Sequence, residues 1–125
     1  MNLTDEQVRT IVREAKSYLG HKYRPGFKCI DYVRKVYQTA GINIGILGPN
    51  SPPAELNIEK EKLQSPPTGS LIFLRNKTEK RERAWSHLVI VLSNDECIHC
   101  SLFIGEVVTS SFEEIFRKYE FAPSL

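Results

Sequence analysis

The first apolar side chains of the chain recur at helical spacing. Within residues 3–20 they return every three or four positions, and Gly20 follows them as a stop signal. Thr4, with Gln7 three residues later, has the pattern of a capping box. The spacing therefore predicts a helix that begins just after Thr4. Its apolar stripe consists of Val8, Ile11, Val12, Ala15, Tyr18 and Leu19.

A second apolar stripe predicts a helix over 28–40, which Gly41 closes. The loop before it, 21–27, contains Pro25 and Gly26, both of which interrupt regular structure. Cys29 then lies in the first turn of this helix. The apolar stripe consists of Ile30, Val33, Val36, Tyr37 and Ala40.

The second half of the chain has short apolar runs separated by turn residues, which predict strands. A Pro- and Gly-rich connection over 43–69 precedes them, with a short helix predicted at 54–63. Helices followed by an antiparallel sheet indicate an α+β fold, and 125 residues indicate one domain over 1–125. The predicted strands are 70–75, 86–92, 96–102 and 106–110, followed by a terminal helix over 110–119 that Ser110 or Ser111 caps.

Charge and hydropathy exclude several classes of partner. The 17 basic and 15 acidic side chains leave a net charge of only +2, so we expect no nucleic-acid partner. The densest basic run, 75–83, also contains glutamates and has the composition of a solvated loop. No apolar run approaches the roughly 20 residues of a membrane span, and the N-terminus lacks a signal-peptide pattern. We therefore expect a cytoplasmic protein as encoded, or one exported without a cleaved signal.

Cys29 is the first candidate for chemistry. The chain has three cysteines, and an odd number without a signal peptide argues against a disulfide framework. A thiol attacks as its thiolate, and the partial positive charge at a helix N-terminus lowers the thiol pKa. The alternative is a small buried hydrophobe, which is the commoner role of a free cysteine.

His87 and His99 are the second candidates, because each lies in a predicted strand among apolar neighbours. A buried imidazole needs a hydrogen-bond partner, and a satisfied core histidine is the alternative role. The two rings share a face of the sheet only if paired residue numbers sum to an even value. A three-residue loop over 93–95 meets this condition, and makes His87 the diagonal neighbour of His99, roughly 7–8 Å away. A two-residue turn would put the rings on opposite faces.

Metal binding is the rival use of these residues. Cys97, His99 and Cys100 form a C-x-H-C run, which is not a usual zinc spacing. Cys97 and Cys100 also point to opposite faces of a strand, so we interpret both as core residues. We expect no metal and no cofactor.

Five short motifs, in order over about 80 residues, resemble those of the NlpC/P60 family of papain-like cysteine peptidases. The family elements are a G-x-P-Y loop, a helix-leading D-C-S-G, a P-G-D-L-V-F strand, an S-H-V-G-I-Y strand and an I-H-A strand. The spacings from Cys29 to His87 (87 − 29 = 58) and from His87 to His99 (99 − 87 = 12) are typical of the family. The counterparts here are GHKY (20–23), KCID (28–31), PTGSLIF (67–73), SHLVIVL (86–92) and IHCS (98–101).

The resemblance implies a papain-like fold and a peptidase or amidase acting on peptides, with muropeptides as the expected substrate and no cofactor. By position, Cys29 corresponds to the nucleophile, His87 to the general base and His99 to the residue that orients it. CHAP amidases share the order of cysteine and histidine, but usually have Asn or Glu in the third position. The implied substrate-binding residues are Tyr23, Lys28, Ile30 and Ser86.

Lys28 and Ile30 depart from the family pattern, which has Asp and Ser beside the cysteine. In peptidoglycan-cleaving members these two bind the free amine of a stem peptide, whereas Lys28 suits a substrate with negative charge. Two alternatives therefore remain: a catalytically silent peptide-binding member, and a thioesterase or acyltransferase with the same triad. Either enzyme predicts a low pKa for Cys29, and a silent member predicts an ordinary one. The sequence does not indicate an oligomeric state.

Overall fold

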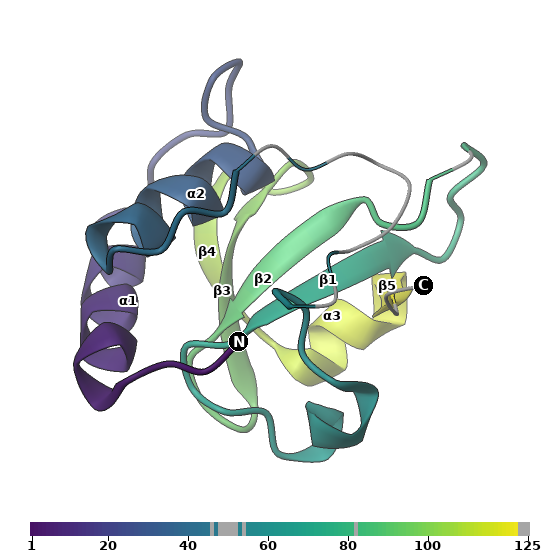
Figure 1. The fold of residues 1–125 in the computed structure, drawn as a ribbon. Coiled ribbons are helices and arrows are strands. Elements are labelled where there is room, and N and C mark those ends of the chain that lie inside the picture. Colours follow the sequence, from purple (N-terminus) through teal and green to yellow (C-terminus); the bar gives the residue numbers. More distant parts are fainter. Residues whose placement is uncertain (46, 48–52, 54, 82, 123–125) are drawn as a thin grey trace.

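The protein is built on a five-stranded antiparallel sheet with the strand order β4-β3-β2-β1-β5. The computed structural model describes residues 1–45, 47, 53, 55–81 and 83–122. The predicted α+β class and the four predicted strands are confirmed, and Figure 1 shows the sheet with helices on both sides. The strands are β1 (Leu71–Asn76), β2 (His87–Val91), β3 (Glu96–Ser101), β4 (Glu106–Ser111) and β5 (Tyr119–Phe121).

The helices begin where the sequence indicates. Thr4 Oγ1 accepts a hydrogen bond from the Gln7 N–H (3.1 Å), and Gln7 Oε1 accepts one from the Thr4 N–H (3.0 Å), so the capping box is confirmed. Ser111 caps α3 in the same way. Of the helix predicted at 54–63 the structure has only a 3-10 turn, and residue 54 lies outside the described residues. The helices are α1 (Asp5–Ser17), α2 (Cys29–Thr39), the 3-10 helix η1 (Lys60–Gln64) and α3 (Phe112–Lys118).

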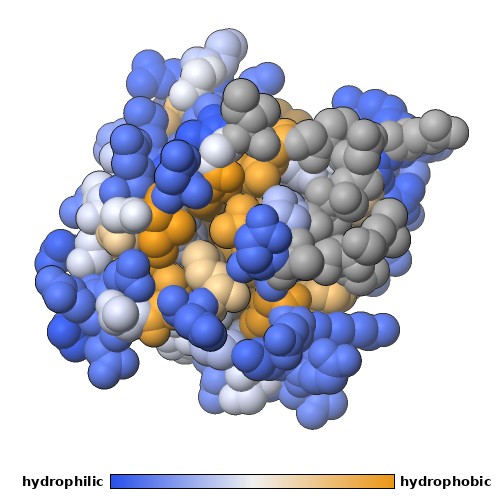
Figure 2. Space-filling view, in the orientation of Figure 1, coloured by the Kyte–Doolittle hydropathy of each residue, from blue (hydrophilic) through white to orange (hydrophobic). Residues whose placement is uncertain are grey.

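Strand alternation divides the core between the two faces of the sheet. On one face, Leu88 and Ile90 of β2 pack with α1 and α2. On the other, Val89 and Val91 pack with α3, whose Ile115 is buried there. The prediction that Cys97 and Cys100 are core residues on opposite faces is confirmed. In Figure 2 apolar side chains gather in the middle of the visible face, and hydrophilic ones surround them.

The register of β2 and β3 follows from a three-residue loop. Ile90 pairs with Ile98 and Val91 with Cys97, so paired numbers sum to 188 (90 + 98). The Leu92 N–H closes the ladder on the Glu96 carbonyl at 2.9 Å. Of the turns that the sequence left open, the structure therefore has the three-residue loop over 93–95 and not the two-residue turn. Among the described residues, no helix is long and apolar enough to cross a membrane.

Asn57 joins the long connection to the sheet. Its side chain is buried, its Nδ2 donates to the Ala122 carbonyl (2.6 Å), and its Oδ1 accepts from the Phe73 N–H (3.0 Å). One amide thus satisfies a backbone group on each of two chain segments that lie far apart in the sequence.

Replacing Asn57 with Ala removes both side-chain hydrogen bonds and leaves the Phe73 N–H and the Ala122 carbonyl buried and unsatisfied. Each such group costs about 1–3 kcal/mol, so we expect Asn57→Ala to lower the free energy of unfolding by about 2–4 kcal/mol. Urea titration followed by circular dichroism measures this change. The exposed Asn2 is the matched control, and Asn2→Ala should change stability by less than about 0.5 kcal/mol. Equal effects of the two substitutions would contradict this role for Asn57.

Candidate active site

A cleft of about 470 Å³ opens at the end of the sheet where β2 begins, and Cys29 and His87 both line it. The connection from β1 to β2 and the turn from β3 to β4 lie at this same end, because Leu74 pairs with His87 and β3 runs antiparallel to β2. The structure therefore brings together residues from α2, β1, β2 and β5 and from four of the connections between elements. The implied substrate-binding residues Tyr23, Lys28, Ile30 and Ser86 line the same cleft.

Cys29 is the first residue of α2 and is half-buried. Burial is the largest influence on its thiol and raises its pKa. The backbone N–H groups of Ile30, Leu88 and Cys29 itself favour the thiolate but do not outweigh burial. The low pKa predicted from the helix terminus alone is therefore wrong for the free protein, because that prediction left out the loss of solvent at the sulfur.

His87 and His99 form a buried pair on the α3 face of the sheet. The Nε2 atom of His87 lies 2.7 Å from Nδ1 of His99, and the rings meet edge to face. Burial lowers the pKa of His87 to about 3, with a smaller contribution from His99. Burial also lowers the pKa of His99 to about 4, and Glu114 opposes that shift. Both imidazoles are therefore neutral at pH 7.

The hydrogen bonds of His99 determine which nitrogen of His87 is available. His99 Nε2 lies 2.9 Å from the hydroxyl of Ser110. If that nitrogen donates to Ser110, His99 Nδ1 is an acceptor, and His87 donates to it from Nε2. His87 Nδ1 then carries no proton and can accept one from a thiol. With the opposite polarity His87 Nδ1 would carry the proton and would not act as a base.

Cys29 and His87 reach the cleft from opposite faces of the sheet. Cys29 belongs to α2, which packs on the face of Leu88, whereas the His87 ring lies on the α3 face. Among the described residues, no hydrogen bond joins the Cys29 thiol to His87. The Leu88 N–H is one of the groups that favour the Cys29 thiolate, so the thiol lies beside the start of β2, where His87 is the first residue.

Tyr119 was not identified from the sequence, although it lies beside both candidates. Its ring stacks on that of His87, with 5.0 Å between centroids and 22° between planes. Burial raises the pKa of Tyr119 to about 12, and Cys29 adds to the shift. Tyr119 belongs to β5, a strand of three residues that the pattern assigned to the terminal helix. The sequence indicates Ser110 only as a candidate helix cap, and Ser111 fills that role.

The other predicted site residues differ in whether their polar side-chain groups are already hydrogen-bonded within the protein. Ser86 Oγ accepts a hydrogen bond from the Asn76 N–H at 2.9 Å, so this hydroxyl supports the β1–β2 connection. The backbone N–H of Lys28 donates to Asp31 Oδ2 (2.9 Å), while Lys28 itself is exposed at the cleft. Asp31 thus caps α2.

The β1–β2 connection forms a charged wall of the cleft. The Glu79 side chain is only 6% exposed, and its two oxygens accept from Arg81 Nε (3.2 Å) and Arg83 Nη2 (2.8 Å). The backbone N–H of Arg81 and the side chain of Arg83 lower the pKa of Glu79 to about 2. The interpretation of 75–83 as a solvated loop is therefore wrong at Glu79, because two arginines from the same run enclose its carboxylate.

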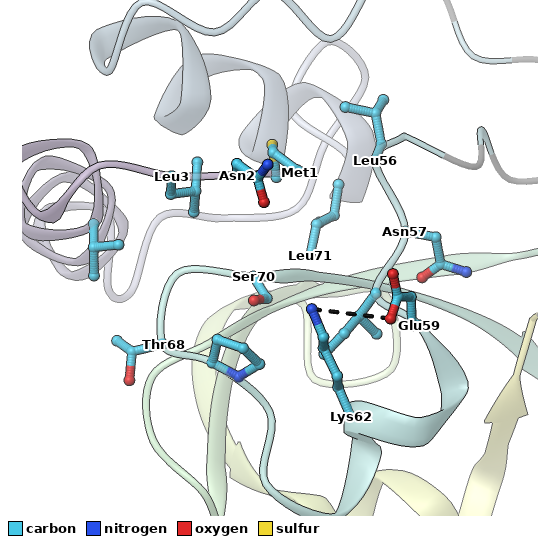
Figure 3. Close-up of a pocket in the computed structure, with 13 residues that line it drawn as sticks. Met1, Asn2, Leu3, Leu56, Asn57, Glu59, Lys62, Thr68, Ser70 and Leu71 are labelled. Atoms are coloured by element: carbon cyan, nitrogen blue, oxygen red, sulfur yellow. Dashed lines mark ion pairs between the residues drawn. The ribbon is translucent and has the colours of Figure 1, made fainter.

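A second cavity of about 260 Å³ lies at the opposite end of β1 (Figure 3). Leu3, Leu56 and Leu71 line it, beside an ion pair between Lys62 and Glu59 at 3.9 Å. None of its lining residues is a cysteine or a histidine, so the chemistry favours the cleft at Cys29. Within the described ranges, no three His, Cys, Asp or Glu side chains are placed to hold a metal ion.

The NlpC/P60 family profile matches residues 15–123. A lipoprotein-like NLP/P60 protein of Staphylococcus aureus has a similar structure (TM-score 0.68, 22% identity, 95% of this chain, 41% of that one). So does an NlpC/P60 protein of Bacillus cereus (TM-score 0.67, 20% identity, 93% of this chain, 40% of that one). The NlpC/p60 domain of the peptidoglycan hydrolase SagA is also similar (TM-score 0.60, 23% identity, 94% and 98%). The chain spans well under half of the first two proteins, and no curated protein matches it significantly.

The buried histidine pair predicts a loss of stability in mild acid. An unfolded histidine has a pKa near 6.5, whereas those of His87 and His99 are about 3 and 4 in the folded protein. As the pH falls below 6.5, the unfolded chain binds protons that the folded protein does not. The free energy of unfolding should therefore be fully retained above pH 6.5 and should drop by about 2–5 kcal/mol by pH 4.5.

Urea titrations at several pH values measure this loss. His99→Gln should remove roughly half of it, since one buried titrating ring is gone. The exposed His21 is the matched control, and His21→Gln should leave the pH dependence unchanged. A wild-type stability that stays constant from pH 6.5 to 4.5 would contradict the neutral buried pair.

Proposed function

Because the chain belongs to the NlpC/P60 family, we propose that it is a cysteine peptidase or amidase that hydrolyses an amide bond in peptidoglycan stem peptides. The observation that carries the proposal is the presence of Cys29 and His87 in one cleft, with His99 hydrogen-bonded behind His87. Similarity to the NlpC/p60 domain of a peptidoglycan hydrolase supports the choice of substrate.

In the proposed reaction Cys29 Sγ attacks the carbonyl carbon of the scissile amide while its proton passes to His87 Nδ1. The negative charge that develops on the carbonyl oxygen lies near the free N–H groups at the start of α2, including that of Cys29. His87 then gives the proton to the leaving amine, which yields an acyl-thiol. Water, deprotonated by His87, hydrolyses this thioester and restores the thiol.

His99 acts on this reaction through His87. A donor–acceptor chain from His87 Nε2 through His99 to Ser110 keeps His87 Nδ1 unprotonated and fixes the plane of its ring. Tyr119, stacked on the face of that ring, restricts its tilt. The base is thereby held in one tautomer and one orientation before substrate arrives.

A neutral resting pair makes proton transfer depend on the substrate. With the pKa of Cys29 raised and that of His87 near 3, ionisation of the pair is unfavourable in the free protein. Transfer therefore accompanies attack on a bound carbonyl, whose developing charge is stabilised in the cleft. Lys28 replaces the family aspartate and does not suit a free amine, so we propose a substrate with a carboxylate there.

The same observations favour one second candidate, a peptide-binding member that has lost catalysis. The raised pKa of Cys29 and the changes at Lys28 and Ile30 point in this direction. Such a protein would bind the peptide in the same cleft without forming an acyl-thiol.

Incubation with purified stem peptides, followed by mass spectrometry of the products, tests the proposal. We expect the wild type to release two fragments from one amide bond. Cys29→Ala should abolish release, and His87→Ala should slow it at least about 100-fold, as expected when a general base is lost. Cys97→Ala is the matched control, because Cys97 is buried at the end of β3 that lies away from the cleft, and it should remain active.

Three results would count against the proposal. Hydrolysis that persists in Cys29→Ala would exclude this nucleophile. Saturable peptide binding without turnover of peptide, ester or thioester substrates would identify the silent peptide-binding member instead. Turnover of esters or thioesters alone would indicate an acyl transferase or thioesterase.

A further inference from the structure

The turn between β3 and β4 exposes three large apolar side chains in succession. Leu102, Phe103 and Ile104 are 62%, 60% and 58% exposed. Single exposed hydrophobes are ordinary on a protein surface, whereas a contiguous group of this kind usually marks a contact site.

The turn is held in a fixed shape. The Ser101 carbonyl accepts from the Gly105 N–H (2.7 Å), and the Ser101 hydroxyl accepts from the Ile104 N–H (3.1 Å). The Gly105 carbonyl in turn accepts from the Tyr23 N–H (2.8 Å), which ties the turn to the loop before α2. Gly105 has φ +89°, a conformation that favours glycine. The apolar side chains are therefore presented at little further cost in conformational entropy.

The turn lies beside the candidate base. Continuing the β2–β3 register, in which paired numbers sum to 188, puts Ser101 opposite His87 (188 − 87 = 101). Leu102 and Phe103 accordingly line the same cleft as Cys29 and His87, whereas Ile104 does not. Tyr23 lines the cleft next to the turn. The hydrogen bond from its backbone N–H to the Gly105 carbonyl holds the loop before α2 against the turn.

The opposite wall of the cleft carries charged side chains. It comes from the β1–β2 connection, where Glu79 is enclosed by Arg81 and Arg83. Because the strand order is β4-β3-β2-β1, the apolar turn and this charged wall flank the start of β2 on opposite sides. The cleft thus has the apolar turn on the β3–β4 side, and on the β1 side it has these charged residues together with Trp85.

We propose that Leu102 and Phe103 form an apolar subsite that receives an aliphatic or aromatic group of the substrate next to the bond attacked by Cys29. This subsite rests on the proposed function, because it takes the molecule that occupies the cleft to be the substrate of the hydrolase, and it deepens that function. It assigns to the substrate an apolar group on one side of the scissile bond, whereas a polar stem peptide alone would leave this wall exposed to water.

Alkylation of Cys29 by two reagents of different size tests the subsite without requiring turnover. The probes are 2-chloroacetamide and N-benzyl-2-chloroacetamide, and peptide mass spectrometry follows Cys29 alone. Each rate is divided by the rate of the same reagent with glutathione, which removes intrinsic reactivity. We expect the benzyl reagent to be favoured about tenfold or more in the wild type, because its ring loses contact with water against Leu102 and Phe103.

The chain offers a matched set of variants. Leu102→Ser and Phe103→Ser should each lower the ratio of the corrected benzyl rate to the corrected 2-chloroacetamide rate towards one. Ile104→Ser removes an equally exposed apolar side chain from the same turn, but outside the cleft, and should retain the wild-type preference. Since all three side chains are exposed, the substitutions should leave the fold intact, which circular dichroism checks.

A wild-type preference near one would overturn the subsite, and so would an equal loss in Ile104→Ser and Phe103→Ser. These results are separable from the fate of the proposed function. Preference without hydrolysis would retain the subsite and reject the hydrolase. Hydrolysis without preference would retain the hydrolase and reject the subsite.

Discussion

The hydrogen bond between His87 Nε2 and His99 Nδ1 is the constraint on which the cleft depends. It exists because the β2–β3 loop has three residues, which makes paired numbers sum to an even value and puts both rings on the α3 face. A shift of one residue would turn the rings to opposite faces. Ser110 on β4 and Tyr119 on β5 then hold the pair from two further strands, so most of the sheet contributes to the position of one imidazole.

Burial gives this arrangement both its order and its electrostatic character. The apolar surroundings that fix the rings also keep them neutral, with pKa values of about 3 for His87 and 4 for His99. The same effect raises the pKa of Cys29 above its usual value. The free cleft therefore holds two uncharged partners that approach from opposite faces of the sheet. The proton therefore passes from Cys29 to His87 only when a bound substrate carbonyl can take up the negative charge. Substrate binding is thus required for the proton transfer.

Local patterns in the sequence predicted the helices and the cap at Thr4, narrowed the cap of α3 to Ser110 or Ser111, and gave the condition on the β2–β3 register that a shared face for the two rings requires. They missed what depends on distant residues. β5 has only three residues and follows α3 directly, so its apolar side chains continue a helical pattern, and Tyr119 was missed with it. The burial of the Glu79 carboxylate depends on how the β1–β2 connection brings Arg81 and Arg83 against it. The pKa of Cys29 was predicted in the wrong direction because burial, unlike a helix terminus, is not visible in neighbouring residues.

In the proposed mechanism the buried pair presents an unprotonated His87 Nδ1 to Cys29. Long-range 1H–15N correlation spectra of protein labelled with 15N-histidine report the protonation of every ring nitrogen. At pH 7 we expect His87 and His99 both to be neutral, with the proton on Nε2 and none on Nδ1, and to remain so down to about pH 5. A His87 ring protonated on Nδ1, or on both nitrogens at pH 7, would contradict the proposed role of His87 as the base for Cys29.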